Sequence, residues 1–179
     1  EETIHIRRAE DEKAASIIGA KTTCFDFLDC IYRRGAEGDW LYADVYLPPH
    51  ETDADLPARI AESISARLTR DDVLICQLSV GSHVDHVIVR QAAELLARPL
   101  LYSIDIPYLF NYPDELASKS AGMKEKLYRV SETGLRSWQD ASLAYASQLS
   151  TLLEPGQDLR DKLQSYWAEQ SGIRLWSFE

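Results

Sequence analysis

The chain has few cysteines, and their arrangement excludes two common frameworks. Cys24, Cys30 and Cys76 are an odd set of three and lack the C-x-x-C spacing of redox motifs and many zinc sites. Two of them lie in or beside apolar runs, so we expect buried free thiols and no disulfide framework. Free thiols favour a reducing compartment, and no signal peptide is visible, so we expect a cytoplasmic protein.

The chain also lacks long apolar runs, a basic surplus and a glycine-rich phosphate loop. No run approaches the roughly 18 residues of a membrane span, so we expect no transmembrane segment. The formal net charge of −10 argues against nucleic acid as a partner. The missing phosphate loop argues against a nucleotide-dependent transferase. Apolar residues make up 45% of the 179 residues, enough for the core of a single domain over residues 1–179.

Strand-like and helix-like segments alternate along the chain. The pattern predicts strands over 22–28, 73–78, 100–104, 125–130 and 173–178. It predicts helices over 7–19, 56–68, 86–97, 135–153 and 159–171. Because such alternation is typical of β-α-β units, we expect an α/β, Rossmann-like three-layer sandwich with a mostly parallel sheet.

Polar side chains follow the first three predicted strands. Asp29, His83 and Asp105 stand directly after or close to the ends of these strands. Because the carboxyl ends of parallel strands meet at one edge of a sheet, we expect the three side chains to lie at the same edge. For Asp105, which comes shortly before a proline, a turn residue is a good alternative interpretation.

The motif His83-Val84-Asp85-His86 stands at the junction between a predicted strand and a predicted helix. Histidines three residues apart can place both rings on one side of a helical turn, beside a carboxylate, which suits metal binding or proton transfer. The alternative is a set of polar helix caps, with Asp85 facing the positive end of the helix dipole. A hydrolytic zinc site needs about three protein ligands, and this motif supplies one or two.

The irregular segment 32–46 is dense in tyrosine, tryptophan and arginine. We consider it a candidate substrate wall, with Tyr32 and Arg33 as candidate substrate-binding residues. An ordinary loop that packs its own aromatic rings over the sheet explains the composition equally well.

Several segments together resemble the PIG-L / LmbE-like family of zinc-dependent N-deacetylases. They are the R-x-x-E helix from Arg7 to Gly19, Phe27-Leu28-Asp29, Gly81 to His86 with Val84 in place of the usual proline, Tyr145-Ala146-Ser147-Gln148, and Arg174-Leu175-Trp176. The family's A-H-P-D-D-E motif is absent. The resemblance therefore implies either that a strand-helix-strand unit precedes Glu1, or that this is a short homologue without catalysis. Gly81 stands where many relatives have a tyrosine.

The resemblance also implies roles for single residues. His86 matches a zinc ligand, and His83 matches the histidine that stabilises the oxyanion and protonates the leaving amine. Asp85 would orient one of the imidazoles, and Arg7 matches an arginine near a polar or anionic group of the substrate. The implied function is zinc-dependent removal of an N-acetyl or other N-acyl group from an amino sugar, glycolipid or glycoconjugate.

A non-catalytic binding protein that keeps the fold without a metal is the alternative function. Because His83 and His86 alone do not complete a three-ligand site, we expect the 179-residue chain by itself to bind zinc weakly or not at all and to be inactive.

Overall fold

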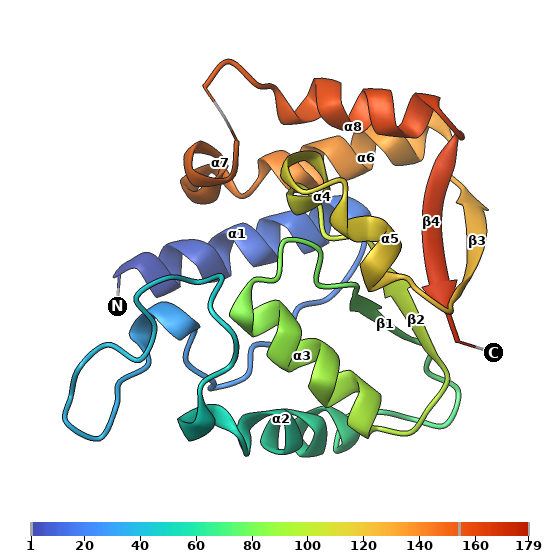
Figure 1. Cartoon of the computed structure of the whole chain (residues 1–179). Helices are drawn as coiled ribbons and strands as arrows, with labels where there is room; N and C mark the ends of the chain where they lie inside the picture. The colour runs from blue at the N-terminus through green and yellow to red at the C-terminus, as the bar shows by residue number, and fades with distance from the viewer. Residues whose placement is uncertain (1, 154, 179) are drawn as a thin grey trace. The chain divides into compact units, whose positions relative to one another are not determined.

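The computed structural model describes residues 2–153 and 155–178. Its chain forms two compact units, a helical unit and a sheet unit. The helical unit comprises Glu1–Cys24 and Leu127–Arg174, and the sheet unit comprises Phe25–Lys126 and Leu175–Glu179. The chain passes from one unit to the other twice after the sheet unit begins, once in β3 (Lys124–Arg129) and once in β4 (Gly172–Ser177) (Figure 1). One domain over residues 1–179 stays a prediction.

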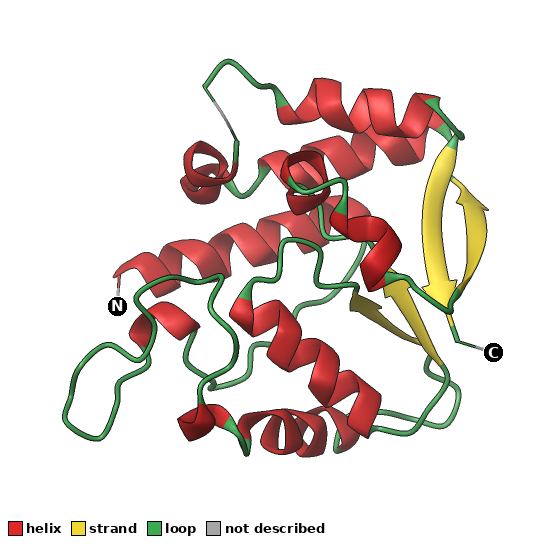
Figure 2. Ribbon diagram, viewed as in Figure 1, coloured by secondary structure: helices red, strands yellow, loops and turns green. Residues whose placement is uncertain are grey.

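The helical unit is built from four helices. They are α1 (Glu2–Ile18), α6 (Glu132–Leu143), α7 (Ala146–Leu152) and α8 (Leu159–Ala168). Helix α1 packs against α6 and α7, and α6 packs against α8 (Figure 2). Small side chains allow the helices to approach, because Ala14, Ala141 and Ala144 form a buried cluster against which Ile17 and Tyr145 pack.

The helix predicted over 135–153 is interrupted between α6 and α7. The Tyr145 hydroxyl donates to Asp11 Oδ1 at 2.9 Å, and Ser147 donates from its backbone N and its Oγ to the Glu10 carboxylate at 2.8 and 2.7 Å. These bonds to α1 hold the chain at the interruption. The periodicity of the sequence does not report bonds to a segment 134 or more residues away.

The sheet unit holds two longer helices, two strands and several short turns of helix. The longer helices are α2 (Leu56–Ser65) and α3 (Val84–Leu95), and the strands are β1 (Leu74–Gln77) and β2 (Leu100–Ser103). The short elements are η1 (Cys30–Tyr32), η2 (Glu51–Asp53), α4 (Tyr108–Asn111) and α5 (Glu115–Lys119).

The four described strands form a mixed sheet in the order β1-β2-β4-β3. Strands β1 and β2 are parallel, with Leu74 opposite Leu100, as expected. Strand β4 runs antiparallel to β2, with Tyr102 opposite Trp176, so the prediction of a mostly parallel sheet is wrong. The alternation rule covers strands joined by one helical crossover, whereas β4 returns after several helices of the helical unit. The three-layer arrangement stays a prediction.

The strand predicted over 22–28 is also wrong, because these residues are irregular in the structure. Phe25 and Phe27 alternate with exposed neighbours and are half-buried, which is the period-two pattern that suggested a strand. Their rings instead lie beside guanidinium groups of α2 and its C-terminal turn, Arg67 for Phe25 and Arg59 for Phe27. Alternation describes a half-buried extended segment, but a strand also needs a ladder partner.

Two clusters form the core of the sheet unit. One lies between α2 and α3 and includes Ile60, Val84 and Ile88. The other joins residues after β1 to the sheet and consists of Leu78, Val80, Tyr102 and Trp176. Burying a side chain of this size contributes about 1.5–3 kcal/mol, so these clusters anchor both the end of β1 and the start of α3.

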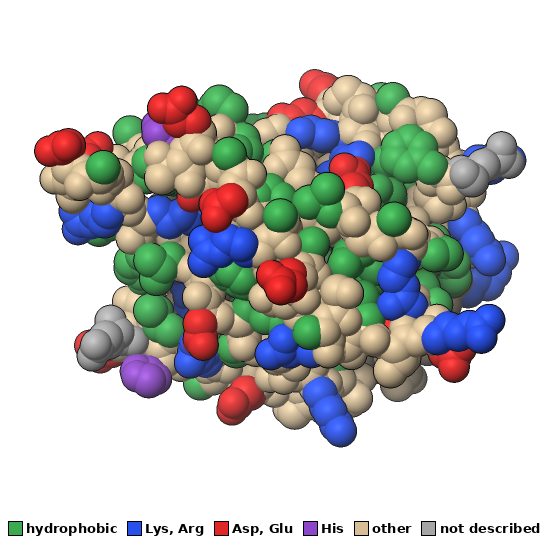
Figure 3. Space-filling model, turned by 90° about the horizontal axis from the view of Figure 1, so that it is seen from below, with side chains coloured by type: hydrophobic (Ala, Val, Ile, Leu, Met, Phe, Trp, Pro, Cys, Tyr) green, Lys and Arg blue, Asp and Glu red, His purple; other side chains and the backbone are tan. Residues whose placement is uncertain are grey.

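The surface charges, the apolarity of the helices and the state of the cysteines bear on three further expectations from the sequence. On the face shown in Figure 3, acidic, basic and apolar side chains are interspersed. Among the described residues, no helix combines the length and apolarity that a membrane span requires. Cys30 and Cys76 are buried free thiols, as expected, and Cys24 is an exposed one.

Candidate active site

The turn between β1 and α3 contains three residues in the left-handed backbone region. The φ angles are 61° for Ser79, 81° for Gly81 and 56° for Ser82. Left-handed conformations at non-glycine residues cost about 1–3 kcal/mol each and persist only where surrounding contacts hold them. Strain of this kind immediately before His83 marks the turn as a candidate functional site.

Two carboxylates hold the backbone of this turn. Asp105 Oδ2 accepts a hydrogen bond from the Val80 N–H at 3.0 Å, and Glu115 Oε2 accepts one from the Gly81 N–H at 2.9 Å. The sequence analysis placed Asp105 at this edge but did not single out Glu115. The only local signal for Glu115 is a carboxylate at the start of a short helix, which is common elsewhere.

Gly81 is required by both its conformation and its neighbours. A Cβ atom built there would lie 2.8 Å from Tyr108 Cδ1 and 3.0 Å from Tyr112 Cδ2, and the φ angle disfavours L residues. The resemblance places a tyrosine at this position in many relatives. Here the ring of Tyr108, from another segment, occupies the space beside Gly81.

His83 is the N-cap of α3. Its Nδ1 accepts a hydrogen bond from the Asp85 N–H at 3.2 Å, so the helix-cap interpretation is confirmed for this residue. In the neutral ring an accepting Nδ1 requires the proton on Nε2, which makes Nε2 a hydrogen-bond donor. Capping and chemistry are therefore compatible, because they use different nitrogens.

His86 is held by a buried carboxylate. Its Nδ1 lies 2.8 Å from Asp105 Oδ1, and the centroids of the His83 and His86 rings are 5.0 Å apart. The expectations that both rings lie on one side and that Asp105 lies at the same edge are confirmed. Contrary to expectation, Asp29 does not end a strand but caps η1 by accepting from the Ile31 N–H at 3.1 Å. A carboxylate on one ring nitrogen directs the other nitrogen toward a metal or a substrate.

Asp85 belongs to a second polar network. Its Oδ2 accepts from the Cys30 N–H at 2.9 Å, and its Oδ1 pairs with the Arg33 guanidinium. Arg33 also pairs with Asp53 at 2.5 Å, and Asp53 accepts the Tyr42 hydroxyl at 2.7 Å. Burial raises the pKa of Tyr42, and the hydrogen bond to Asp53 raises it further. The carboxylate that orients His86 is thus Asp105, while Asp85 anchors the start of α3.

The segment 32–46 was considered either a substrate wall or an ordinary packed loop, and the contacts of its two arginines are those of a packed loop. The Arg33 guanidinium is buried between carboxylates, and Arg34 stacks 3.2 Å from the centroid of the Trp40 ring. These contacts are ordinary loop packing. Tyr32 is half-buried at the end of η1. Substrate binding by Tyr32 and Arg33 stays a prediction.

Two tyrosines lie beside the histidine pair, and a third packs against one of them. The Tyr108 ring lies 5.0 Å from His86 and 6.1 Å from His83, and the Tyr46 ring lies 6.4 Å from His83 and 5.9 Å from Tyr112. Burial raises the pKa of Tyr46 and of Tyr108 to about 12, so both hydroxyls are neutral donors at physiological pH. The sequence analysis named the segment of Tyr46 but not the other two, which come from the turn after β2.

One group of three side chains in the described part of the chain could hold a metal ion. Cys30, His83 and Asp85 each offer a ligand atom, and these atoms lie within 4.8 Å of one another. Burial and the neighbouring Asp29 carboxylate raise the pKa of the Cys30 thiol to about 11. Sequence analysis missed Cys30, because nothing near it in sequence resembles a metal motif.

Arg7 lies on α1 in the helical unit and is half-buried. The R-x-x-E segment ends at Glu10, whose carboxylate accepts the two hydrogen bonds from Ser147. Both bonds lower the pKa of Glu10, and the bond from the Ser147 hydroxyl has a larger effect than the bond from the backbone N–H. Two of the segments that carry the family resemblance therefore meet in this unit. Contact between Arg7 and a substrate stays a prediction.

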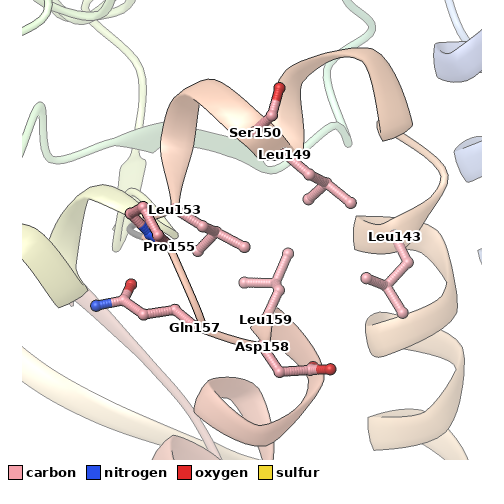
Figure 4. A pocket seen from close by; sticks show the side chains of 8 residues that line it. All are labelled: Leu143, Leu149, Ser150, Leu153, Pro155, Gln157, Asp158 and Leu159. Atoms are coloured by element: carbon pink, nitrogen blue, oxygen red, sulfur yellow. The ribbon is translucent and has the colours of Figure 1, made fainter.

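The helical unit also contains an apolar pocket of about 460 Å³ (Figure 4). It is lined by Leu143, Leu149, Ser150, Leu153, Pro155, Gln157, Asp158 and Leu159. The Asp158 carboxylate caps α8 by accepting from the backbone N–H groups of Arg160 and Asp161. The pocket holds none of the residues that the sequence analysis singled out.

Comparison with solved structures finds a similar fold in deacetylases. The zinc inhibited form of teicoplanin deacetylase Orf2 has a TM-score of 0.79 and 23% identity, covering 98% of this chain and 74% of that one. A deacetylase–teicoplanin complex has a TM-score of 0.77 and 22% identity, covering 99% and 74%. A deacetylase–bog complex has a TM-score of 0.77 and 25% identity, covering 98% and 73%. No protein-family model and no curated protein matches the sequence. The chain therefore shares the mixed α/β fold of these deacetylases.

Proposed function

We propose that the chain is a zinc-dependent N-deacetylase of the PIG-L / LmbE-like kind, acting on an N-acetylated amino sugar, glycolipid or other glycoconjugate. The observation that carries the proposal is the bond between His86 Nδ1 and the buried Asp105, beside the ring of His83. The fold shared with deacetylases, one of them in complex with teicoplanin, supports it. The buried free thiols support a cytoplasmic location as part of the proposal.

At this turn, His86 fits one ligand position of a zinc site. Because Asp105 bonds Nδ1 of His86, the lone pair for a metal is on Nε2, which is the usual arrangement of a metal-ligating histidine. When bound, zinc lowers the pKa of a water and polarises an amide carbonyl. His86 is therefore our candidate metal ligand.

The protein's own groups supply the remaining steps. His83, with its proton on Nε2, would donate a hydrogen bond to the amide oxygen as negative charge develops there. The proton that the leaving amine takes up is the one that the attacking water loses; His83 would relay it and end as the neutral ring again. Asp85 positions His83, because it joins the start of α3 to the Cys30 N–H and to Arg33. We retain Arg7, Tyr32 and Arg33 as candidate substrate-binding residues.

The test uses the full-length gene product and follows amine release from an N-acetylglucosaminyl glycoconjugate beside the zinc content. His83→Ala should lower turnover by about two to four orders of magnitude and leave zinc nearly intact. His86→Ala should remove the zinc. His50→Ala is the matched control, because His50 caps a helical turn through its side chain as His83 does, but in η2.

If the His83 and His86 variants both keep full zinc and full turnover, the proposal is wrong. The His83–His86 turn would then be a polar helix start on a binding protein without catalysis, the alternative function that the sequence left open.

A further inference from the structure

The structure brings together three metal-binding groups from two distant segments of the sheet unit. Cys30 begins η1, whereas His83 and Asp85 begin α3. Their ligand atoms lie within 4.8 Å of one another, and donors of a tetrahedral zinc, each about 2.0–2.3 Å from the metal, are roughly 3.5 Å apart. A small closure of the two half-buried side chains is therefore enough to surround an ion. Thiolate, imidazole and carboxylate are the donors that zinc takes.

Hydrogen bonds preorganise this group. The Cys30 N–H donates to Asp85 at 2.9 Å, so η1 is joined to the start of α3. The Val84 N–H donates to the Val45 carbonyl at 2.8 Å, which joins the loop after η1 to the same helix end. A carboxylate has about four acceptor positions, and the Cys30 N–H and Arg33 use two of those on Asp85. Asp85 thus keeps acceptor capacity for a cation.

The Cys30 thiol is better suited to a metal than to nucleophilic catalysis. Its side chain is almost fully buried, so the sulfur is shielded from a substrate. A thiophilic cation replaces the proton, which leaves to solvent as the metal–sulfur bond forms. His83 and Asp85 are half-buried, so solvent reaches the group from their side.

We infer that Cys30, His83 and Asp85 form a binding site for a thiophilic divalent cation of the zinc type, separate from the metal position at His86. The neutral His83 ring has one lone pair, which accepts the Asp85 N–H, so an ion bound there replaces the cap bond. The consequence for activity rests on the proposed function: an ion on His83 removes the group that donates to the amide oxygen. The site would then be inhibitory.

Cobalt(II) alone is the probe for binding, because a cobalt–thiolate bond gives a charge-transfer band in the near ultraviolet and a cobalt–imidazole bond does not. The wild-type chain should develop this band as cobalt is added, with a final amplitude of one thiolate bond per chain, and zinc should displace it. Cys30→Ser should abolish the band. Cys24→Ser and Cys76→Ser are the matched controls and should keep it, because Cys24 is exposed and Cys76 is buried elsewhere, in β1.

His83→Gln is the second test and keeps every thiol. It should weaken cobalt binding by more than the roughly 10–100-fold that loss of an outer-shell partner costs. Circular dichroism verifies that the variants are folded. The inference is overturned if wild type shows no thiolate band, if Cys24→Ser removes the band, or if His83→Gln binds cobalt as wild type does.

The two proposals fail separately. Absence of the thiolate band overturns the second metal site whatever the turnover is. A thiolate band in a protein without amide hydrolysis leaves the site in place and overturns the proposed function. If both hold, zinc beyond one equivalent should inhibit wild type and should not inhibit Cys30→Ser.

Discussion

The sheet unit buries charge, whereas the described helical unit buries almost only apolar side chains, alanines and leucines among them. Arg33, Asp53 and Asp105 are all buried charged residues of the sheet unit. In the described part of the helical unit, Gln139 is the buried polar side chain. Helices α1 and α6 of this unit meet through Ala14 and Ala141. A buried charge is costly unless it is paired. Well-packed apolar side chains in place of a buried ion pair would stabilise a unit equally well.

The two kinds of interior have different roles: buried charges position particular groups, whereas apolar packing holds the helices together. The charges of the sheet unit lie around the turn of His83 and His86, where they hold specific atoms in place. The alanines of the helical unit specify how closely helices approach. Four substitutions, each with a control, test this contrast by their effect on urea unfolding.

The largest effect is expected from Arg33→Ala. It leaves Asp53 and Asp85 without their buried cation, and breaking a buried pair in this way costs about 3–5 kcal/mol. Arg34→Ala is the control, because Arg34 is exposed and bonds the Gly38 carbonyl, and it should change stability by at most about 1 kcal/mol. Equal losses for the two variants would contradict the claim that the sheet unit depends on buried charge.

Gly81→Ala comes next. The new methyl group has both an unfavourable φ and a contact of 2.8 Å with the Tyr108 ring. Gly38→Ala has a similar φ of +83° with nothing within 4 Å, so it isolates the conformational cost, about 1 kcal/mol. We expect Gly81→Ala to lose about 1–3 kcal/mol more than Gly38→Ala, since overpacking adds that much. If the two are equal, Tyr108 does not pack against the turn.

Ala14→Leu tests the helical unit. Enlarging a side chain in the buried alanine cluster should cost about 1–3 kcal/mol by overpacking. Ala9→Leu lies on the exposed side of the same helix and should change the free energy of unfolding by at most about 0.5 kcal/mol. A neutral Ala14→Leu would mean that the small side chains do not determine the approach of α1 and α6.

Glu10→Gln should have the smallest effect and a dependence on pH. The folded pKa of Glu10 is lowered by Ser147, so its stabilisation is complete above the ordinary pKa of 4.5 and disappears as the pH falls through the lowered value. The urea midpoints of wild type and Glu10→Gln should therefore differ at pH 7 and converge in acid. In a Ser147→Ala background, which loses the hydroxyl bond but keeps the backbone N–H bond, the difference at pH 7 should become smaller. A gap that persists in acid would assign the effect to packing.

Local patterns account for most helices and for part of the site. The predicted helices over 7–19, 56–68 and 86–97 correspond to α1, α2 and α3, because apolar spacing and caps act within a few residues. The same locality explains why His83 and Asp85 were found: a capping histidine and an acidic first turn are neighbours in sequence. The predicted strands over 125–130 and 173–178 are β3 and β4 for the same reason.

The sequence by itself determined most of the longer helices, that the cysteines are free, and that two histidines share one helical turn. Only the tertiary structure decided that Asp105 bonds His86, that Arg33 is buried beside Asp85, and that Cys30 lies against His83. The direction of β4 belongs to the second group as well. Each of these depends on a contact between segments far apart in the chain. Such a contact leaves no periodic trace in one sequence, because packing and burial select it after the local elements have formed.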